Sequence, residues 1–229
     1  TPQWKALMTS LALVATDLDH TFLGADQRPS ELNTHSVFAA AEHGAAVVFA
    51  TGRPLRWLDL LEVFTDVNPT VIASNGAVTY DLRNHRVISD TPFPIDVITD
   101  VVNDIASELP EAKFSLEEAQ RCCVEPGFDR VDHGRPVTHQ GPIHEFLTPD
   151  SRPVKMLVRA FGIPTEELFE IVDGLVDGRV STTFSVQLDD GLVELAPIGV
   201  SKGAALSATA EQLGVDLADA AAFGDMPND

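Results

Sequence analysis

The stretch Leu11-Ala12-Leu13-Val14-Ala15-Thr16-Asp17-Leu18-Asp19-His20-Thr21 decides the fold of this chain. It opens with a short, continuous apolar run, which is typical of a strand buried on both faces of a parallel sheet. Similar runs occupy residues 46–50, 71–73 and 220–223, and segments with helical spacing of apolar residues lie between them. Strands that alternate with helices at this pitch predict an α/β fold with a doubly wound parallel sheet.

The middle of the chain departs from this rhythm. Residues 77–80 and 86–88 flank a turn-like segment and are expected to pair as a hairpin. Further helices and strands follow, among them a predicted strand over 180–188, before the first pattern returns near residue 201. We therefore predict a core made of residues 1–80 and 197–229, interrupted by an inserted α/β domain over 81–196.

Composition excludes several classes of function. The 229 residues are 44% apolar, and 15 Lys+Arg against 35 Asp+Glu give a net charge of −20. A chain with this charge repels nucleic acids and anionic membranes, so neither is an expected partner. There is no basic leader, no apolar run near the ~20 residues of a spanning helix, and only one adjacent pair of cysteines. We expect a cytoplasmic protein, and the pattern carries no signal of its oligomeric state.

Two acids follow the first predicted strand. Asp17 and Asp19 face the same way if the strand continues, because side chains alternate along a strand. Doubly wound sheets bind their ligands at the carboxyl ends of the strands, where this pair lies. Carboxylates held close together repel each other, and a hard divalent cation such as Mg²⁺ relieves that repulsion. The alternative for this pair is a solvated acidic turn.

Two further segments suit an anion. Thr51-Gly52-Arg53 follows the second strand and, with Pro54 next, is predicted to open a helix through residue 61, whose first N–H groups would bind an anion. Lys202 precedes another helical run and would offset phosphate or carboxylate charge. The alternatives are a helix-capping threonine and a surface lysine.

A third acid follows the last strand. Asp225 would lie beside the first acidic pair in a parallel sheet, although Gly224–Asp229 also suits an ordinary turn. The four elements all follow predicted core strands or begin core helices. Together they supply paired acids, an anion-binding turn, a lysine and a third acid, which are the parts that phosphoryl transfer needs.

These segments resemble a known family. Asp17–Thr21, Thr51–Arg53, the Ser201-Lys202 pair and Gly224–Asp229 are similar to the four motifs of the haloacid dehalogenase-like (HAD) phosphohydrolases. Ser74-Asn75-Gly76-Ala77, just ahead of the insert, resembles the Cof-type subgroup, whose cap is an inserted α/β domain. The resemblance implies a Rossmann-like HAD core with such a cap.

The resemblance also implies residue roles. Asp17 would be the nucleophile that becomes an aspartyl phosphate, and Asp19 the general acid and then the base. The implied phosphate-binding residues are Thr51, Gly52, Arg53, Lys202 and Asn228, and the implied Mg²⁺ ligands are Asp17, Asp19, Asp225 and Asp229. For Asp19 the ligand would be its backbone carbonyl.

Two features depart from the family pattern. His20 stands where the family often has glycine, and the chain stops at Asp229 where the family continues through at least a strand and a helix. We expect the rest of the core to be missing from this chain.

The sequence therefore predicts a Mg²⁺-dependent phosphatase that hydrolyses a small phosphorylated metabolite, such as a sugar phosphate, through an aspartyl phosphate. A phosphomutase of the same superfamily is one alternative. A phosphate-accepting receiver-like signalling module is the other, although receivers lack a second acid two residues after the acceptor.

Overall fold

The computed structural model describes residues 11–128 and 137–225. The chain divides into two compact units, a first unit of Thr1–Ser89 with Ser201–Asp229 and a second unit of Asp90–Val200. The second unit is therefore an insertion in the sequence of the first. Each unit has its own sheet of six strands.

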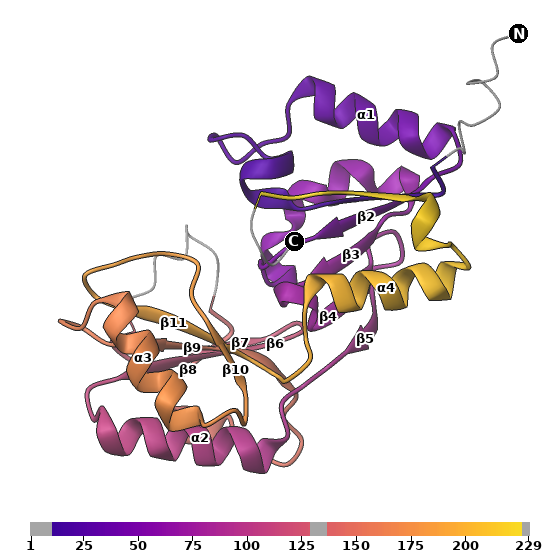
Figure 1. Cartoon of the computed structure of the whole chain (residues 1–229). Coiled ribbons are helices and arrows are strands. Elements are labelled where there is room, and N and C mark those ends of the chain that lie inside the picture. The colour runs from indigo at the N-terminus through magenta and orange to yellow at the C-terminus, as the bar shows by residue number, and fades with distance from the viewer. Residues whose placement is uncertain (1–10, 129–136, 226–229) are drawn as a thin grey trace, which may run out of the picture. The chain divides into compact units, whose positions relative to one another are not determined.

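The sheet of the first unit is mainly parallel (Figure 1). Its strands lie in the order β12-β1-β2-β3-β4-β5. The pairs β12–β1, β1–β2 and β2–β3 are parallel, and the pair β3–β4 is antiparallel. The predicted α/β class is confirmed by this arrangement. The strands span Leu13–Thr16 (β1), Ala46–Ala50 (β2), Thr70–Ala73 (β3), Val78–Asp81 (β4), Arg86–Asp90 (β5) and Ala220–Phe223 (β12).

Strands β4 and β5 belong to the sheet of the first unit, so the insert begins later in the chain than expected. The sequence prediction began the inserted domain at residue 81 and ended it at 196, whereas the structure divides the chain after Ser89 and after Val200. Residues 86–90 extend the sheet of the first unit next to β4. The hairpin therefore stays with the first unit because its backbone hydrogen bonds go to that sheet.

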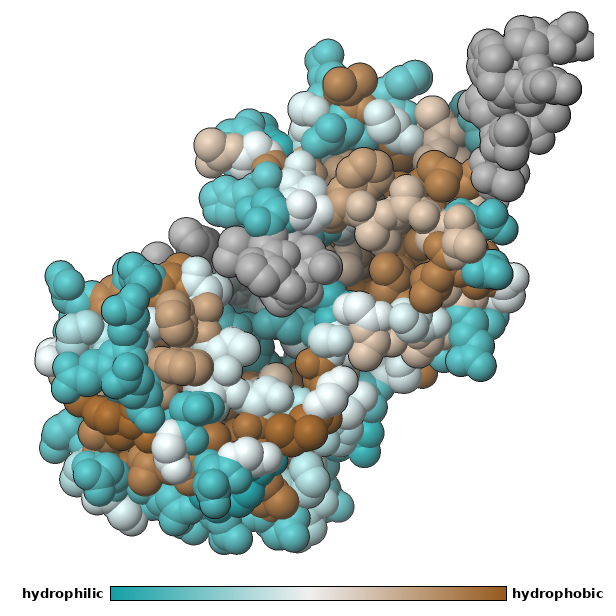
Figure 2. Space-filling model, in the orientation of Figure 1, coloured by the Kyte–Doolittle hydropathy of each residue, from teal (hydrophilic) through white to brown (hydrophobic). Residues whose placement is uncertain are grey.

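Two helices cover opposite faces of this sheet, α1 (Glu31–Glu42) and α4 (Lys202–Leu213) (Figure 1). On the α4 face, Ala210 packs with inward side chains of β1, β2 and β3. On the α1 face the core is aromatic, and the Phe49 and Phe64 ring centroids lie 5.4 Å apart. Strand β12 forms one edge, where Phe223 is exposed and the surface is apolar (Figure 2).

The segment after Pro54 is not the predicted helix. It forms two 3₁₀ helices, Leu55–Trp57 and Asp59–Val67. The buried side chains Leu58, Leu61 and Phe64 lie three residues apart. That spacing matches the three residues per turn of a 3₁₀ helix, so this geometry keeps all three on the core side.

The second unit is an antiparallel sheet with helices on one face. Its strands lie in the order β10-β11-β9-β6-β7-β8, and only β7 and β8 are paired in parallel. The expected strand over 180–188 is limited to β10, so that prediction was too long. The strands span Lys113–Glu118 (β6), Cys122–Val124 (β7), His139–Gln140 (β8), Pro153–Arg159 (β9), Ser181–Thr183 (β10) and Leu192–Ala196 (β11).

Helices α2 (Ile95–Glu108) and α3 (Thr165–Val176) contribute Ile98, Ile105 and Leu168 to the main core of the second unit. On the sheet, Met156 and Val158 alternate with Lys155 and Leu157, so the helix-covered face is apolar and the other face is mixed. None of the helices in the described residues is both long and apolar enough to cross a membrane.

Candidate active site

Asp17 and Lys202 form the centre of the candidate site. Asp17 directly follows β1, and its backbone N–H donates to the Phe223 carbonyl at 2.9 Å. The Lys202 Nζ donates to Asp17 Oδ1 at 2.6 Å, and both side chains are less than a tenth exposed. Lysine is electrostatically unfavourable at the start of a helix, so this carboxylate compensates for its position as the first residue of α4. The structure brings these two predicted residues together across 185 positions of sequence.

Asp19 and Arg53 form a second pair. The Arg53 Nε donates to Asp19 Oδ2 at 2.9 Å, and its Nη2 donates to Asp19 Oδ1. The same Nη2 also donates to Gln27 Oε1. Arg53 is largely buried, whereas the Asp19 side chain is 40% exposed. Gln27 was not predicted from the sequence, because nothing in its local pattern marks it as a partner of residues 8 and 26 positions away.

A tight turn carries Asp19 away from the sheet. Leu18–Phe22 forms a tight turn that is closed by the Leu23 N–H, which donates to the Leu18 carbonyl at 2.8 Å, and its dihedral angles are not helical at Asp19 and His20. His20 adopts φ +60° at its centre. That is the left-handed region that glycine enters most readily, which gives a physical reason for the glycine common at this position in the family.

The third predicted acid is tied to the same turn. The Thr21 Oγ1 donates to Asp225 Oδ1 at 3.1 Å. Asp17 and Asp225 lie one and two residues beyond the register pair Thr16–Phe223 of the parallel strands β1 and β12. Asp17 and Asp225 thus lie side by side at the carboxyl ends of these two neighbouring strands.

The predicted anion-binding loop is held by a neighbouring turn. Thr51 is fully buried, and its Oγ1 accepts a hydrogen bond from the Arg53 N–H at 3.1 Å. The Asn75 N–H donates to the Thr51 carbonyl at 3.0 Å, and the Ser74 N–H donates to the Arg53 carbonyl at 2.9 Å. The segment after the loop is 3₁₀, so the predicted α-helix start is absent there. The loop is instead shaped by its contacts with Ser74 and Asn75.

Three consecutive left-handed residues make that turn. Ser74, Asn75 and Gly76 have φ values of +50°, +57° and +105°. A Cβ on Gly76 would lie 2.2 Å from the Ser201 carbonyl oxygen. The turn can therefore touch the residue that caps α4 only because Gly76 lacks a side chain, and this contact sets the position of Lys202. The Ser-Asn-Gly composition is a turn signal in the sequence, but its contact with α4 is not.

The acids suit a hard cation by their chemistry. Asp17 and Asp225 offer carboxylate oxygens, the ligands that Mg²⁺ prefers, and the Asp19 backbone carbonyl remains compatible with that role. The Asp19 carboxylate itself contacts Arg53. Within residues 11–128 and 137–225, no three His, Cys, Asp or Glu side chains converge as a metal site. The predicted Asn228 and Asp229 lie outside the described residues.

Comparison with known proteins agrees with this arrangement. Residues 14–229 match the family described as haloacid dehalogenase-like hydrolase. An HMP-PP phosphatase of Serratia proteamaculans is 28% identical, over 95% of this chain and 78% of that protein.

Two solved structures share the fold. The chain BT1666 from Bacteroides thetaiotaomicron, described as a phosphatase of the haloalkanoate (HAD) enzyme superfamily, has a TM-score of 0.79 at 23% identity, covering 100% of this chain and 81% of that one. The HAD subclass IIB sugar phosphatase BT4131 has a TM-score of 0.78 at 18% identity, covering 95% and 82%. The family match over residues 14–229 and the paired acids, lysine and threonine loop at the strand ends lead to one conclusion: this chain belongs to the haloacid dehalogenase-like hydrolases.

Proposed function

We propose that this chain is a Mg²⁺-dependent phosphatase that hydrolyses a small phosphorylated metabolite, such as a sugar phosphate, through an aspartyl phosphate on Asp17. The observation that carries the proposal is the buried Asp17–Lys202 pair, with N and O atoms 2.6 Å apart, at the carboxyl end of β1. A buried carboxylate at this position can attack phosphorus only where nearby positive charge offsets its repulsion from the phosphate. Lys202 supplies such a charge.

The first half of the reaction uses three side chains. An oxygen of the Asp17 carboxylate bonds to phosphorus while the bond from phosphorus to the leaving alcohol breaks. Asp19, in its protonated form, donates its proton to that alcohol oxygen. The Thr51 hydroxyl accepts from the Arg53 N–H, so its own proton can be donated to a phosphoryl oxygen.

The second half restores the enzyme. The Asp19 carboxylate takes a proton from water, the water oxygen bonds to phosphorus, and the bond from phosphorus to Asp17 breaks. Mg²⁺, held by Asp17, Asp225, Asp229 and the Asp19 carbonyl, would neutralise charge between the acids and the phosphate. Gly52, Arg53 and Asn228 would add donors to the phosphate.

The relatives support the substrate class. The Serratia protein is named for HMP-PP, and BT4131 is described as a sugar phosphatase. Both names describe small phosphorylated metabolites, and the net charge of −20 on this chain gives no attraction to a polyanionic macromolecule.

The direct test is phosphate release. We expect the wild-type chain with Mg²⁺ to hydrolyse p-nitrophenyl phosphate and members of a panel of phosphorylated sugars and other metabolites. Asp17→Asn should lower kcat by about a thousandfold or more, because it removes the nucleophile. Asp100→Asn, the same change at an exposed position of α2, is the control. Full activity in Asp17→Asn would exclude the covalent mechanism.

Metal removal tests the second part of the proposal. Chelation with EDTA should lower the rate by about a hundredfold or more, because the acids then repel the phosphate without compensation. Added Mg²⁺ should restore the rate, and Ca²⁺ at equal concentration should restore less because it favours larger, more flexible coordination. A rate that EDTA leaves unchanged would contradict Mg²⁺ dependence.

A further inference from the structure

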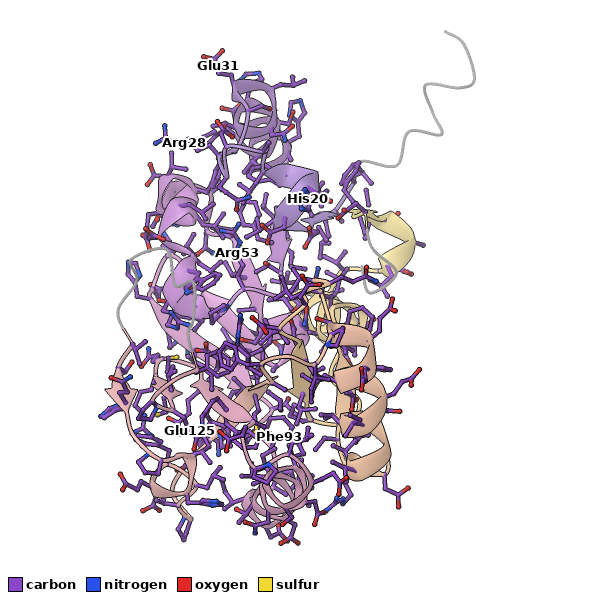
Figure 3. All side chains as sticks on the ribbon, turned by 90° about the vertical axis from the view of Figure 1, so that its left-hand side faces the viewer. His20, Arg28, Glu31, Arg53, Phe93 and Glu125 are labelled. Atoms are coloured by element: carbon purple, nitrogen blue, oxygen red, sulfur yellow. The ribbon has the colours of Figure 1, made fainter. Side chains whose placement is uncertain are left out.

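The Asp19 clamp, which consists of Gln27, Arg53 and Asp19, joins the candidate acid to a turn that the sequence did not assign to the site. Gln27 lies in the turn Gly24–Arg28, whose ends are tied by the bond from the Gly24 N–H to the Arg28 carbonyl, 2.9 Å long. Its amide oxygen accepts from the Arg53 Nη2. Figure 3 shows Arg53 below Arg28 and His20 in the first unit. The three clamp side chains thus form one continuous hydrogen-bonded chain.

The clamp occupies both oxygens of the Asp19 side chain. Both Asp19 carboxylate oxygens accept hydrogen bonds from Arg53. A carboxyl group whose two oxygens both face one guanidinium cannot face a leaving alcohol at the same time. To protonate a leaving alcohol, Asp19 has to separate from at least one Arg53 donor.

The Arg53 guanidinium can also bind a second anion, the phosphoryl group of a substrate. A guanidinium binds phosphoryl oxygens in the same forked geometry in which it binds a carboxylate. Arg53 belongs to the loop whose Thr51 is buried and whose own N–H bonds to the Thr51 hydroxyl. The residue that holds the acid is therefore part of the loop that we propose binds the phosphate.

We propose that Arg53 changes partner from Asp19 to the phosphoryl group of the substrate, and that Gln27 is a positioning residue that stabilises the arrangement before the exchange. The inference rests on the proposed phosphatase function. Substrate binding then supplies the free energy that opens the clamp, and the Asp19 side chain separates from Arg53 only when a phosphate is bound. No covalent step is added to the reaction.

The exchange predicts that replacing Gln27 lowers KM rather than raising it. Gln27→Met keeps the unbranched side chain, and hence the backbone preference at φ +61°, but removes the acceptor for Arg53. The clamped state is then less stable, so Arg53 is free to bind phosphate in a larger fraction of the protein molecules. We expect KM to fall by about three- to tenfold, with a matching fall in the inhibition constant of inorganic phosphate.

Two further variants complete the test. Gln212→Met, the same change at an exposed position of α4, should leave both constants unchanged. Arg53→Lys loses the forked geometry, so KM and the inhibition constant of inorganic phosphate should both rise by about tenfold or more. If Arg53 only held Asp19, the inhibition constant of phosphate would stay the same or fall in Arg53→Lys, and the exchange would be refuted.

The outcomes separate this inference from the proposed function. If the wild-type chain releases no phosphate from any substrate, the proposed function fails before any variant is compared. If the wild-type chain is active and Gln27→Met leaves KM and phosphate inhibition unchanged, or raises either, then the exchange is wrong while the phosphatase function stands. Thermal unfolding of each variant, measured alongside, shows that a change in KM does not come from partial unfolding.

Discussion

Two lysine–carboxylate pairs, one in each unit, have the same N···O distance of 2.6 Å, and all four side chains are about nine-tenths buried. Lys155 and Glu194 lie on β9 and β11 in the antiparallel part of the sheet of the second unit, where the β6–β9 register shifts once, between Glu117 and Glu118. The Ser185 hydroxyl donates to Glu194 at 2.7 Å, and Lys155 is opposite Glu117 in the strand register. Lys202 and Asp17, in contrast, join the start of a helix to the end of a strand.

The difference lies in what surrounds each pair. Next to Asp17 and Lys202 the backbone is left-handed at His20 and over Ser74–Gly76. Next to Lys155 and Glu194 the backbone forms extended strands. Unfavourable backbone conformations persist where the surrounding structure holds them, and they gather at functional sites. The same pair of charges can thus serve the structure in one unit and, as proposed, chemistry in the other.

The largest expected contrast is in activity. Lys202→Met should lower kcat/KM by about a thousandfold, because the phosphoryl group loses a cation in a buried site. Lys155→Met should stay within about tenfold of wild type, measured at a temperature where both variants are folded. Both should lose about 3–5 kcal/mol of stability, because each leaves a buried carboxylate without its partner. Equal losses of activity would remove the functional distinction between the two pairs.

The next contrast concerns the turn behind Lys202. Gly76→Ala should lower the free energy of unfolding by about 3 kcal/mol or more, because its Cβ would lie 2.2 Å from the Ser201 carbonyl oxygen and φ is +105°. Gly203→Ala, on α4 with nothing within 4 Å of the added Cβ, should gain about 0.5–1 kcal/mol. Urea unfolding measures both. A mild effect of Gly76→Ala would show that the turn does not fix α4.

How far the sequence predicts each region depends on the range of the contacts. The apolar runs predicted β1, β2, β3 and β12, because a short continuous apolar run is a local signature of such a strand, although β12 is an edge strand with Phe223 exposed. They did not predict the 3₁₀ helices, because a spacing of three residues at Leu58, Leu61 and Phe64 also fits part of a helical pattern.

The candidate site divides in the same way. Asp17 and Asp225 were expected side by side because parallel strands bring their carboxyl ends together, and Lys202 was expected at the start of a core helix. The contact of Gln27 with Arg53 and the contact of Gly76 with Ser201 depend on side-chain and backbone geometry between distant segments. No periodicity or spacing in the sequence encodes such contacts.

A smaller contrast concerns the loss of stability at acid pH. Burial alone would raise the pKa of Glu194, but the Lys155 ammonium and the Ser185 hydroxyl together hold that pKa below its usual value. A lowered folded-state pKa stabilises the fold at pH values above the unfolded pKa of about 4.3, and this contribution is lost as the pH falls through the folded-state value. Urea unfolding from pH 7 to pH 3 should therefore show a steeper loss for wild type than for Glu194→Gln. Parallel curves would mean that Glu194 does not contribute to acid unfolding.

The smallest expected effect tests whether the backbone around Asp17 is strained. His20→Gly should raise the free energy of unfolding by about 0.5–1 kcal/mol, because glycine adopts φ +60° without the steric cost that a Cβ brings. His35→Gly, at an exposed position inside α1, should lower it by about the same amount, because glycine weakens a helix interior. Opposite signs for the same substitution can arise only from the local backbone, so thermal unfolding of the two variants isolates that contribution. If His20→Gly also lost stability, the turn Leu18–Phe22 would be free of backbone strain. The contrast between a strained candidate active site and the extended strands around Lys155 and Glu194 would then rest on Ser74–Gly76 alone.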